Sequence, residues 1–206
     1  LGLILKLFSN YSCPATFCVP GLVIEQRPQV VGMIIENVHG IAHHSWSHKW
    51  IVNMSPEEER EWMSRGYEII ERTTGRAPVG YRSPAAEFSP ITLNLLREFG
   101  FGYSSNYFDD DSPYLHTIDG QLSNIVEYPF HWVLDDAPFF QYSITLPGRT
   151  MQAPSAVLEA WKAEFDMLYL EDREFVLALH PQIIGRPSRI AVLEDLIKNI
   201  KMHDKI

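Results

Sequence analysis

The sequence predicts an α/β protein. Short runs of apolar or β-branched residues alternate along the chain with amphipathic helical patterns, an order typical of parallel strands covered by helices on both faces. The chain has 206 residues, of which 46% are hydrophobic and 21% charged, a composition that suits a globular protein with one sizeable core. We therefore expect a single domain spanning residues 1–206.

Helix starts are marked by capping residues. The clearest is at Ser55-Pro56, where Glu58 completes a capping box and Gly75 suits the C-terminal end, so a helix is expected from Pro56 to about Thr74. Further helices are expected after Ser89-Pro90, ending at Gly100, from Ser155, and after Pro187-Ser188. A helical pattern also begins at Leu1.

The predicted strands are the short apolar runs between these helices. They cover residues 15–19, 79–82, 102–105, 124–132 and 175–179. The stretch 108–121 is rich in Asp, Ser, Pro and Gly, so it is expected to be a surface loop, and a second loop is expected over 147–154.

Charge and cysteine usage exclude several classes of protein. The net charge is −9, with 26 acidic against 17 basic residues, which argues against nucleic-acid binding. The apolar start Leu1–Phe8 is far shorter than the roughly 20 residues of a membrane span and lacks the features of a targeting signal. Cys13 and Cys18 lie five apart in a stretch with a strand-like pattern, where they would face opposite ways. We expect two reduced thiols and a cytoplasmic location.

His44 and His48 form the most informative pair in the chain. In an extended strand they would lie about 13 Å apart, whereas in a helical turn their β-carbons come within about 6 Å. A shared metal ion therefore requires a helical turn here. Imidazole pairs suit zinc, but a catalytic zinc site normally has three protein ligands and a water. The alternative is a histidine-rich loop without metal.

Arg82 and His180 follow two of the predicted strands. Functional residues of α/β sheets and barrels gather at the carboxyl ends of strands, which favours a catalytic position for both. The alternatives are a surface ion pair for Arg82 and a histidine hydrogen-bonded to the backbone for His180.

Four motifs in order resemble the polysaccharide deacetylase family, also called the NodB-homology family. They are Ala15–Gly21, His44–His48, Tyr81–Pro84 and Leu179–Pro181. The stretches His131–Asp136 and His180–Arg189 are similar to a branch that contains peptidoglycan deacetylases and allantoinase-like or cyclic-imide hydrolases. The resemblance covers nearly the whole chain and implies a distorted (β/α) barrel.

The resemblance implies a hydrolase that cleaves non-peptide amide bonds, with a small molecule or a glycan as its substrate. In this family a divalent metal, expected to be zinc, is bound by one Asp and two His; a second Asp is the general base. Carried onto this chain, His44 and His48 are metal ligands, Arg82 orients the base and His180 is the general acid. Self-association into a homo-oligomer stays open.

The same motifs imply further site residues. Asp135 is expected to orient His180 or raise its basicity, and Trp132 and Leu179 are expected to wall an acyl pocket, although plain core packing explains these two equally well. Tyr81 and Pro84, the first and last residues of the arginine motif, are expected to bind substrate.

Two acidic residues that the family places on its first strand have no counterpart here. No Asp or Glu occurs between Leu1 and Ile24. Asp135 and Asp136 are adjacent, so on a strand they face opposite ways and at most one could replace a missing ligand. The chain also ends just after a predicted helix, so the barrel is expected to lack its first and last strands.

We therefore expect a fragment of a longer deacetylase, with little or no activity of its own. The alternatives are a pseudoenzyme that binds glycans through aromatic residues such as Trp46, Tyr103 and Trp132, a complete enzyme with a rearranged site, and a metal-free hydrolase of cyclic amides.

Overall fold

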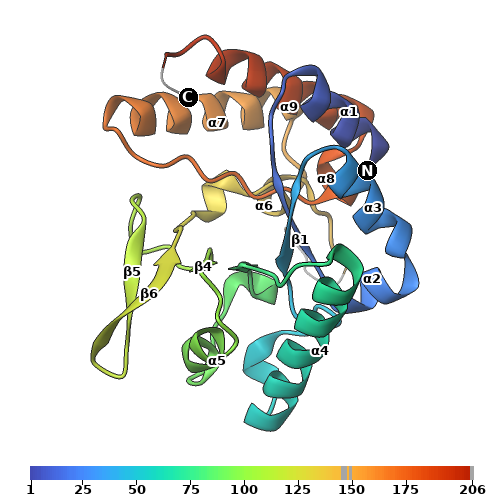
Figure 1. Ribbon diagram of the computed structural model, residues 1–206. Helices are drawn as coiled ribbons and strands as arrows, with labels where there is room; N and C mark the ends of the chain where they lie inside the picture. The colour runs from blue at the N-terminus through green and yellow to red at the C-terminus, as the bar shows by residue number, and fades with distance from the viewer. Residues whose placement is uncertain (145–147, 149, 205–206) are drawn as a thin grey trace. The chain divides into compact units, whose positions relative to one another are not determined.

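The computed structural model describes residues 1–144, 148 and 150–204 (Figure 1). The chain divides into two compact units. The sheet unit comprises Pro14–Tyr107 and Pro113–Pro129, and the helical unit comprises Leu1–Cys13, Phe108–Ser112 and Phe130–Ile206. The loop predicted over 147–154 begins outside the described residues, as do the last two residues of the chain.

The sheet unit contains one six-stranded mixed sheet of order β1-β2-β3-β4-β6-β5. All neighbouring strands are parallel except β5 and β6. The strands are β1 Thr16–Val19, β2 Gly40–His43, β3 Gly80–Tyr81, β4 Tyr103–Ser104, β5 Tyr114–Ile118 and β6 Gln121–Glu127. Strands β2, β3, β4 and β6 all run in the same direction. The residues that follow them therefore lie at the same edge of the sheet.

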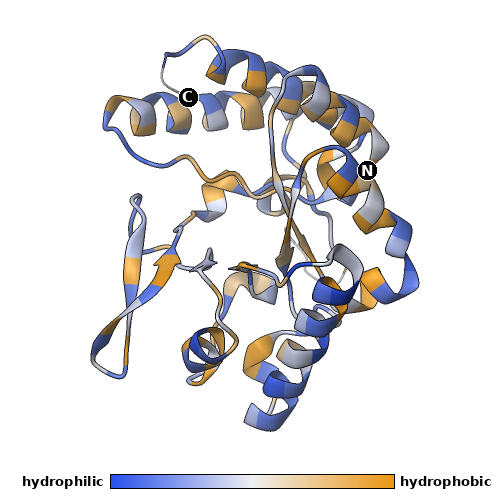
Figure 2. Cartoon of the chain, viewed as in Figure 1, coloured by the Kyte–Doolittle hydropathy of each residue, from blue (hydrophilic) through white to orange (hydrophobic). Residues whose placement is uncertain are grey.

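Four α-helices and two 3₁₀ turns complete the sheet unit. They are α2 Gly21–Gln26, α3 Pro28–Glu36, η1 Ile51–Asn53, α4 Pro56–Thr74, η2 Pro84–Ala86 and α5 Thr92–Glu98. The prediction for α4 is confirmed: the Ser55 side chain accepts a hydrogen bond of 3.2 Å from the Glu58 amide, and Gly75 ends the helix with φ of 72°. Figure 2 shows a largely hydrophilic α4, whose buried apolar residues include Met63, Ile69 and Ile70.

The surface loop predicted over 108–121 is wrong. Residues Tyr114–Ile118 form β5, which pairs antiparallel with β6 in a hairpin. Its turn residues Asp119 and Gly120 have φ of 53° and 75°, and an Asp-Gly pair with two positive φ angles is the favoured two-residue hairpin turn. That dipeptide was the signal in the sequence.

The helical unit contains α1 Gly2–Asn10, η3 Trp132–Leu134, α6 Ala137–Phe140, α7 Pro154–Leu170, α8 Pro181–Ile184 and α9 Pro187–Ile200. Helices α7 and α9 pack together, with Trp161, Phe165, Leu193 and Leu196 buried. Helix α7 begins at Pro154 with Ala153 as its N-cap, not at Ser155. The strand predicted over 175–179 is reduced to an isolated parallel bridge between Ala178 and Asp135.

The predicted α/β class is confirmed, and the two cysteines are free thiols as expected. Cys18 lies in β1, whereas Cys13 precedes the strand. No helix among the described residues is both long enough and apolar enough to cross a membrane.

Candidate active site

His44 and His48 lie in the loop that follows β2. Their ring centroids are 4.8 Å apart with an angle of 78° between the ring planes. The helical turn predicted to bring them together is wrong: residues 44–50 are irregular, and Ser45 and His48 have φ of 57° and 64°. Two left-handed residues therefore bend the loop, a conformation that costs energy in non-glycine residues and is held by the surrounding packing.

Trp46 anchors this loop from within. Its side chain is buried, and the Arg65 guanidinium lies 3.9 Å from the centroid of its ring. A β-carbon placed on Gly21, the first residue of α2, would lie only 2.5 Å from Trp46 Cε3. The sequence therefore needs glycine at position 21 so that the indole can pack against α2.

The environment of His44 suits a metal ligand. Its Nδ1 lies 2.7 Å from the carbonyl oxygen of Arg82; because a carbonyl can only accept, Nδ1 carries the proton and Nε2 keeps its lone pair. Burial lowers the pKa of His44 to about 3, so the ring is neutral near pH 7. A neutral imidazole oriented through its other nitrogen is the form in which histidine binds metals.

His43 is held in a different way and is unavailable to a metal. Its side chain is fully buried, Nδ1 accepts a hydrogen bond of 3.1 Å from the Ser45 amide, and Nε2 lies 3.1 Å from the Met63 carbonyl in α4. Both ring nitrogens are therefore used within the protein, and burial lowers the pKa of His43 to about 4.

Arg82 follows β3 and connects three strand ends. Its amide donates to the His43 carbonyl at 3.0 Å, and its guanidinium donates to Ser105 Oγ at 2.5 Å. Ser105 Oγ in turn donates to the Tyr128 carbonyl at 2.6 Å. These contacts place Arg82 in a structured network at the carboxyl edge of the sheet.

The substrate contacts predicted for Tyr81 and Pro84 need correction. Tyr81 is only 1% exposed and packs in the core with Met63, Leu95 and Phe101. Pro84 is also buried, at the start of η2. In the short strand β3 the Tyr81 side chain faces the core. Arg82 therefore lies at the end of the strand, whereas its motif neighbours Tyr81 and Pro84 pack in the interior.

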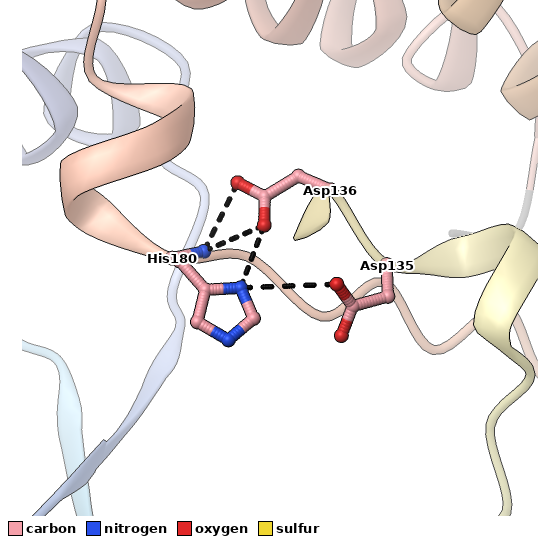
Figure 3. Close-up of side chains that lie close together, drawn as sticks. All are labelled: Asp135, Asp136 and His180. Carbon is pink, nitrogen blue, oxygen red and sulfur yellow. Dashed lines mark hydrogen bonds and ion pairs between the residues drawn. The ribbon is translucent and has the colours of Figure 1, made fainter. Parts of the chain in front are cut away.

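In the helical unit, His180 is paired with a carboxylate (Figure 3). Its Nδ1 lies 2.7 Å from Asp136 Oδ1, and its backbone amide donates to both oxygens of Asp136 at 3.1 Å. Asp135 Oδ1 lies farther away, 3.8 Å from Nδ1. Asp135 is therefore close enough for an ion pair with His180, and its role beside the histidine stays a prediction, but the direct hydrogen-bond partner is Asp136.

Both aspartates turn toward the same histidine, contrary to the expectation that they face opposite ways. Asp135 is extended, with φ of −131° and ψ of 139°, whereas Asp136 is helical, with φ of −78° and ψ of −21°, at the start of α6. The alternation of a strand therefore stops between them. Pro138, early in α6, was the sequence signal for this change.

The Asp136–His180 pair has the geometry of an acid–base dyad. The buried carboxylate holds the proton on Nδ1 and leaves Nε2 to exchange a proton with a substrate. Within the described residues, Asp135, Asp136 and His180 are also the one group of three candidate metal ligands whose atoms lie within 4.8 Å of one another. Both Asp136 oxygens are already used by His180, so the arrangement fits proton transfer better than metal binding.

Trp132 and Leu179 lie in the same unit as the dyad. Trp132 is 41% exposed and contacts the rings of Phe108 and Phe130, with centroids 5.2 and 5.8 Å away. Leu179 is half-buried directly before His180. Their role as walls of an acyl pocket stays a prediction.

An α/β protein with two neighbouring imidazoles after one strand, one of them oriented by a carbonyl, and an Asp–His dyad has the parts of a hydrolase that uses acid–base chemistry. The family model described as polysaccharide deacetylase matches residues 3–104. The chain belongs to the polysaccharide deacetylase family, whose members are metalloenzymes that remove acetyl groups by amide hydrolysis.

Relatives with sequence and structural similarity agree with this assignment. A peptidoglycan deacetylase of Helicobacter pylori is 29% identical over 98% of this chain and 78% of its own length. A solved Mycobacterium smegmatis protein described as a polysaccharide deacetylase has a TM-score of 0.91 and 33% identity, covering 98% of this chain and 71% of that one. The solved Puue allantoinase has a TM-score of 0.87 and 27% identity, covering 99% and 67%.

Proposed function

We propose that this domain serves in metal-dependent N-deacetylation of an N-acetylated glycan, with peptidoglycan as the substrate expected from its relatives. The observation that carries the proposal is His44, a neutral imidazole whose Nδ1 is bound to the Arg82 carbonyl and whose Nε2 is left to bind a metal beside His48. Imidazole donors favour zinc among the common divalent ions of hydrolases.

Each residue then has a definite part in the chemistry. When bound, a divalent metal would polarise the amide carbonyl and the attacking water. His44 and His48 would hold it, and Arg82 would orient the general base. His180, with its Nδ1 proton held by Asp136, would give the Nε2 proton to the leaving amine. Trp132 and Leu179 would contact the acetyl group.

Two histidines supply two of the three protein ligands that a catalytic zinc site normally has. We propose that the carboxylate ligand and the general base lie outside these 206 residues in the protein that carries this domain. Residues 1–206 alone are then expected to bind zinc weakly and to show little or no deacetylase activity.

Zinc titration by calorimetry tests the ligand pair directly. The chain is expected to bind one zinc ion per molecule, and His44→Ala and His48→Ala should each weaken binding at least about tenfold. His131→Ala, at an exposed histidine of the helical unit whose Nδ1 accepts a hydrogen bond from the Val133 amide, is the matched control. Equal zinc affinity in all four proteins would contradict the assignment.

Activity is then measured on the longest natural form of the protein, as acetate released from N-acetylglucosamine oligomers and from peptidoglycan. Loss of acetate release in a chelator and its recovery with zinc are expected. Binding of these glycans with no acetate release under any metal would favour a glycan-binding pseudoenzyme instead.

A second candidate is hydrolysis of cyclic amides, favoured by the 27% identity and TM-score of 0.87 to an allantoinase. The same protein should be assayed on allantoin and on hydantoin-like rings. Ring opening that persists in the presence of a chelator, with no acetate release from glycans, would favour this candidate over deacetylation.

A further inference from the structure

Glu127, the last residue of β6, is a fully buried carboxylate with four hydrogen-bond donors around it. Oε1 accepts from the amides of Asn106 and Tyr107, at 2.5 and 2.8 Å. Oε2 contacts the Ser104 hydroxyl and lies 2.9 Å from His116 Nε2. One side chain therefore joins β4, β5, β6 and the loop that follows β4.

The Ser104–His116–Glu127 group is not a nucleophile with its base. In a catalytic triad the serine and the acid contact opposite nitrogens of the histidine, whereas here Ser104 Oγ and Glu127 Oε2 both contact Nε2 of His116. All three side chains are buried, with exposed fractions of 0%, 3% and 0%. A substrate cannot reach the hydroxyl, so the group must act through what it holds in place.

Glu127 holds the loop after β4 in place, and this loop contacts the Arg82–Ser83 segment that follows β3. Asn106, fixed through its amide by Glu127, accepts a hydrogen bond of 2.7 Å from the Ser83 amide through Oδ1. The preceding residue, Ser105, accepts from the Arg82 guanidinium at 2.5 Å. The loop therefore meets the Arg82–Ser83 segment twice, once at the side chain and once at the backbone.

The Arg82–Ser83 segment carries the carbonyl that orients His44. Arg82 O lies 2.7 Å from His44 Nδ1. If Arg82 moved, this carbonyl would no longer hold the proton on Nδ1, and the proton could shift to Nε2. The path from Glu127 to His44 has three hydrogen bonds, Glu127 to the Asn106 amide, Ser105 to the Arg82 guanidinium and the Arg82 carbonyl to His44. The peptide bond between Ser105 and Asn106 connects the first two, and the whole path lies within the sheet unit.

We propose that Glu127 is a positioning residue: through Ser105 and Asn106 it sets both the Arg82 guanidinium and the tautomer of His44. The proposal rests on the proposed function only in taking His44 as a metal ligand. It extends the network that orients His44 from the Arg82 backbone carbonyl to the buried Glu127 carboxylate, through the loop residues Ser105 and Asn106. Partners of this kind typically contribute about 10- to 100-fold to metal affinity.

The test compares Glu127→Gln with Glu59→Gln. Glu59 is a matched control because it is also buried, at 2% exposed, and accepts hydroxyl hydrogen bonds of 2.5 Å from Ser89 and Thr92. Its contacts serve the start of α5 and do not lead to Arg82. An amide has one acceptor oxygen where a carboxylate has two, so both variants are expected to be less stable than the wild type.

Two readouts separate positioning from stability. Nitrogen-15 NMR of the imidazole rings reports the His44 tautomer without any metal, and calorimetry reports zinc affinity. Glu127→Gln should convert His44 from one Nδ1–H tautomer to a mixture and weaken zinc binding about tenfold. Glu59→Gln should leave both unchanged. Equal tautomer populations in the two folded variants would overturn the proposal.

If Glu127→Gln does not fold, Ser105→Ala removes the next link, the Arg82 guanidinium contact, and should give the same tautomer mixture. An unchanged His44 tautomer in Ser105→Ala would then overturn the proposal. Absence of zinc binding in the wild type would contradict the proposed function, whereas the tautomer readout would still decide the role of Glu127.

Discussion

At the scale of single residues, two histidines have their protons placed by a neighbouring acceptor. The Arg82 carbonyl holds the Nδ1 proton of His44, and the Asp136 carboxylate holds that of His180. In both rings Nε2 is the atom left for chemistry, a metal bond at His44 and proton transfer at His180. The acceptors differ because a neutral carbonyl suits a neutral ligand, whereas a carboxylate stabilises an imidazolium that forms during proton transfer.

Asp136→Asn tests the dyad. The amide no longer stabilises a protonated His180, so acetate release by the protein that carries this domain should fall about 100- to 10,000-fold. Asp135→Asn is the control: its Oδ1 caps the Ala137 amide at 2.7 Å and lies 3.8 Å from His180, and a loss below tenfold is expected. A larger loss in Asp135→Asn than in Asp136→Asn would show that the assignment between the two is reversed.

At the scale of elements, helix α4 reaches β2 through a glycine. A β-carbon on Gly66 would lie 2.3 Å from His43 Nε2, whereas one on Gly32 in α3 would meet nothing within 4 Å. Both are mid-helix glycines, which cost conformational entropy in a helix. Only Gly66 is required by packing, because the buried imidazole occupies the space of its side chain.

Gly66→Ala and Gly32→Ala should therefore change stability in opposite directions. Gly66→Ala forces the His43 ring away from the Met63 carbonyl and should lower the free energy of unfolding by about 1–3 kcal/mol. Gly32→Ala should raise it by about 0.5–1 kcal/mol. Urea unfolding of both variants measures this, and stabilisation by Gly66→Ala would show that α4 and β2 are not packed as described.

At the scale of the whole molecule, buried titrating groups make stability depend on pH. Burial lowers the pKa of His43 from 6.5 to about 4, so between these pH values the unfolded chain binds a proton that the folded chain does not. Burial by itself raises the pKa of Glu127, but hydrogen bonds from His116, Ser104 and the amides of Asn106 and Tyr107 outweigh it and leave the pKa below its ordinary 4.5. Both groups therefore stabilise the folded state at neutral pH, and both lose this contribution as the pH falls toward their folded-state pKa values.

The free energy of unfolding should therefore fall as the pH is lowered from 6.5 toward 4. His43 alone should contribute about 1.4 kcal/mol per pH unit, or about 3 kcal/mol over this window. Below pH 4.5 the contribution of Glu127 is lost in addition, as pH falls through its folded pKa. Urea unfolding at several pH values measures the curve. A flat curve between pH 6.5 and 4.5 would show that His43 is not buried as a neutral ring.

Prediction from sequence succeeded where a few neighbouring residues decide the outcome. The capping box at Ser55 and Glu58 and the left-handed Gly75 both follow from short-range spacing. The failures have particular causes. The Asp119-Gly120 turn lies within a polar stretch that resembles a loop, and the adjacent pair Asp135-Asp136 resembles a strand although the backbone turns helical at Asp136.

By itself, the sequence determined the α/β class, the helices with strong caps, and the ordered histidine and arginine motifs that mark a deacetylase. Only the tertiary structure decided which aspartate pairs with His180, which nitrogen of His44 carries the proton, and that Glu127 supports Arg82. Those contacts join residues 44, 38 and 23 positions apart for Asp136–His180, His44–Arg82 and Arg82–Ser105. Local patterns cannot specify them, because the orientation of each side chain is set by the strands and loops that fold against it.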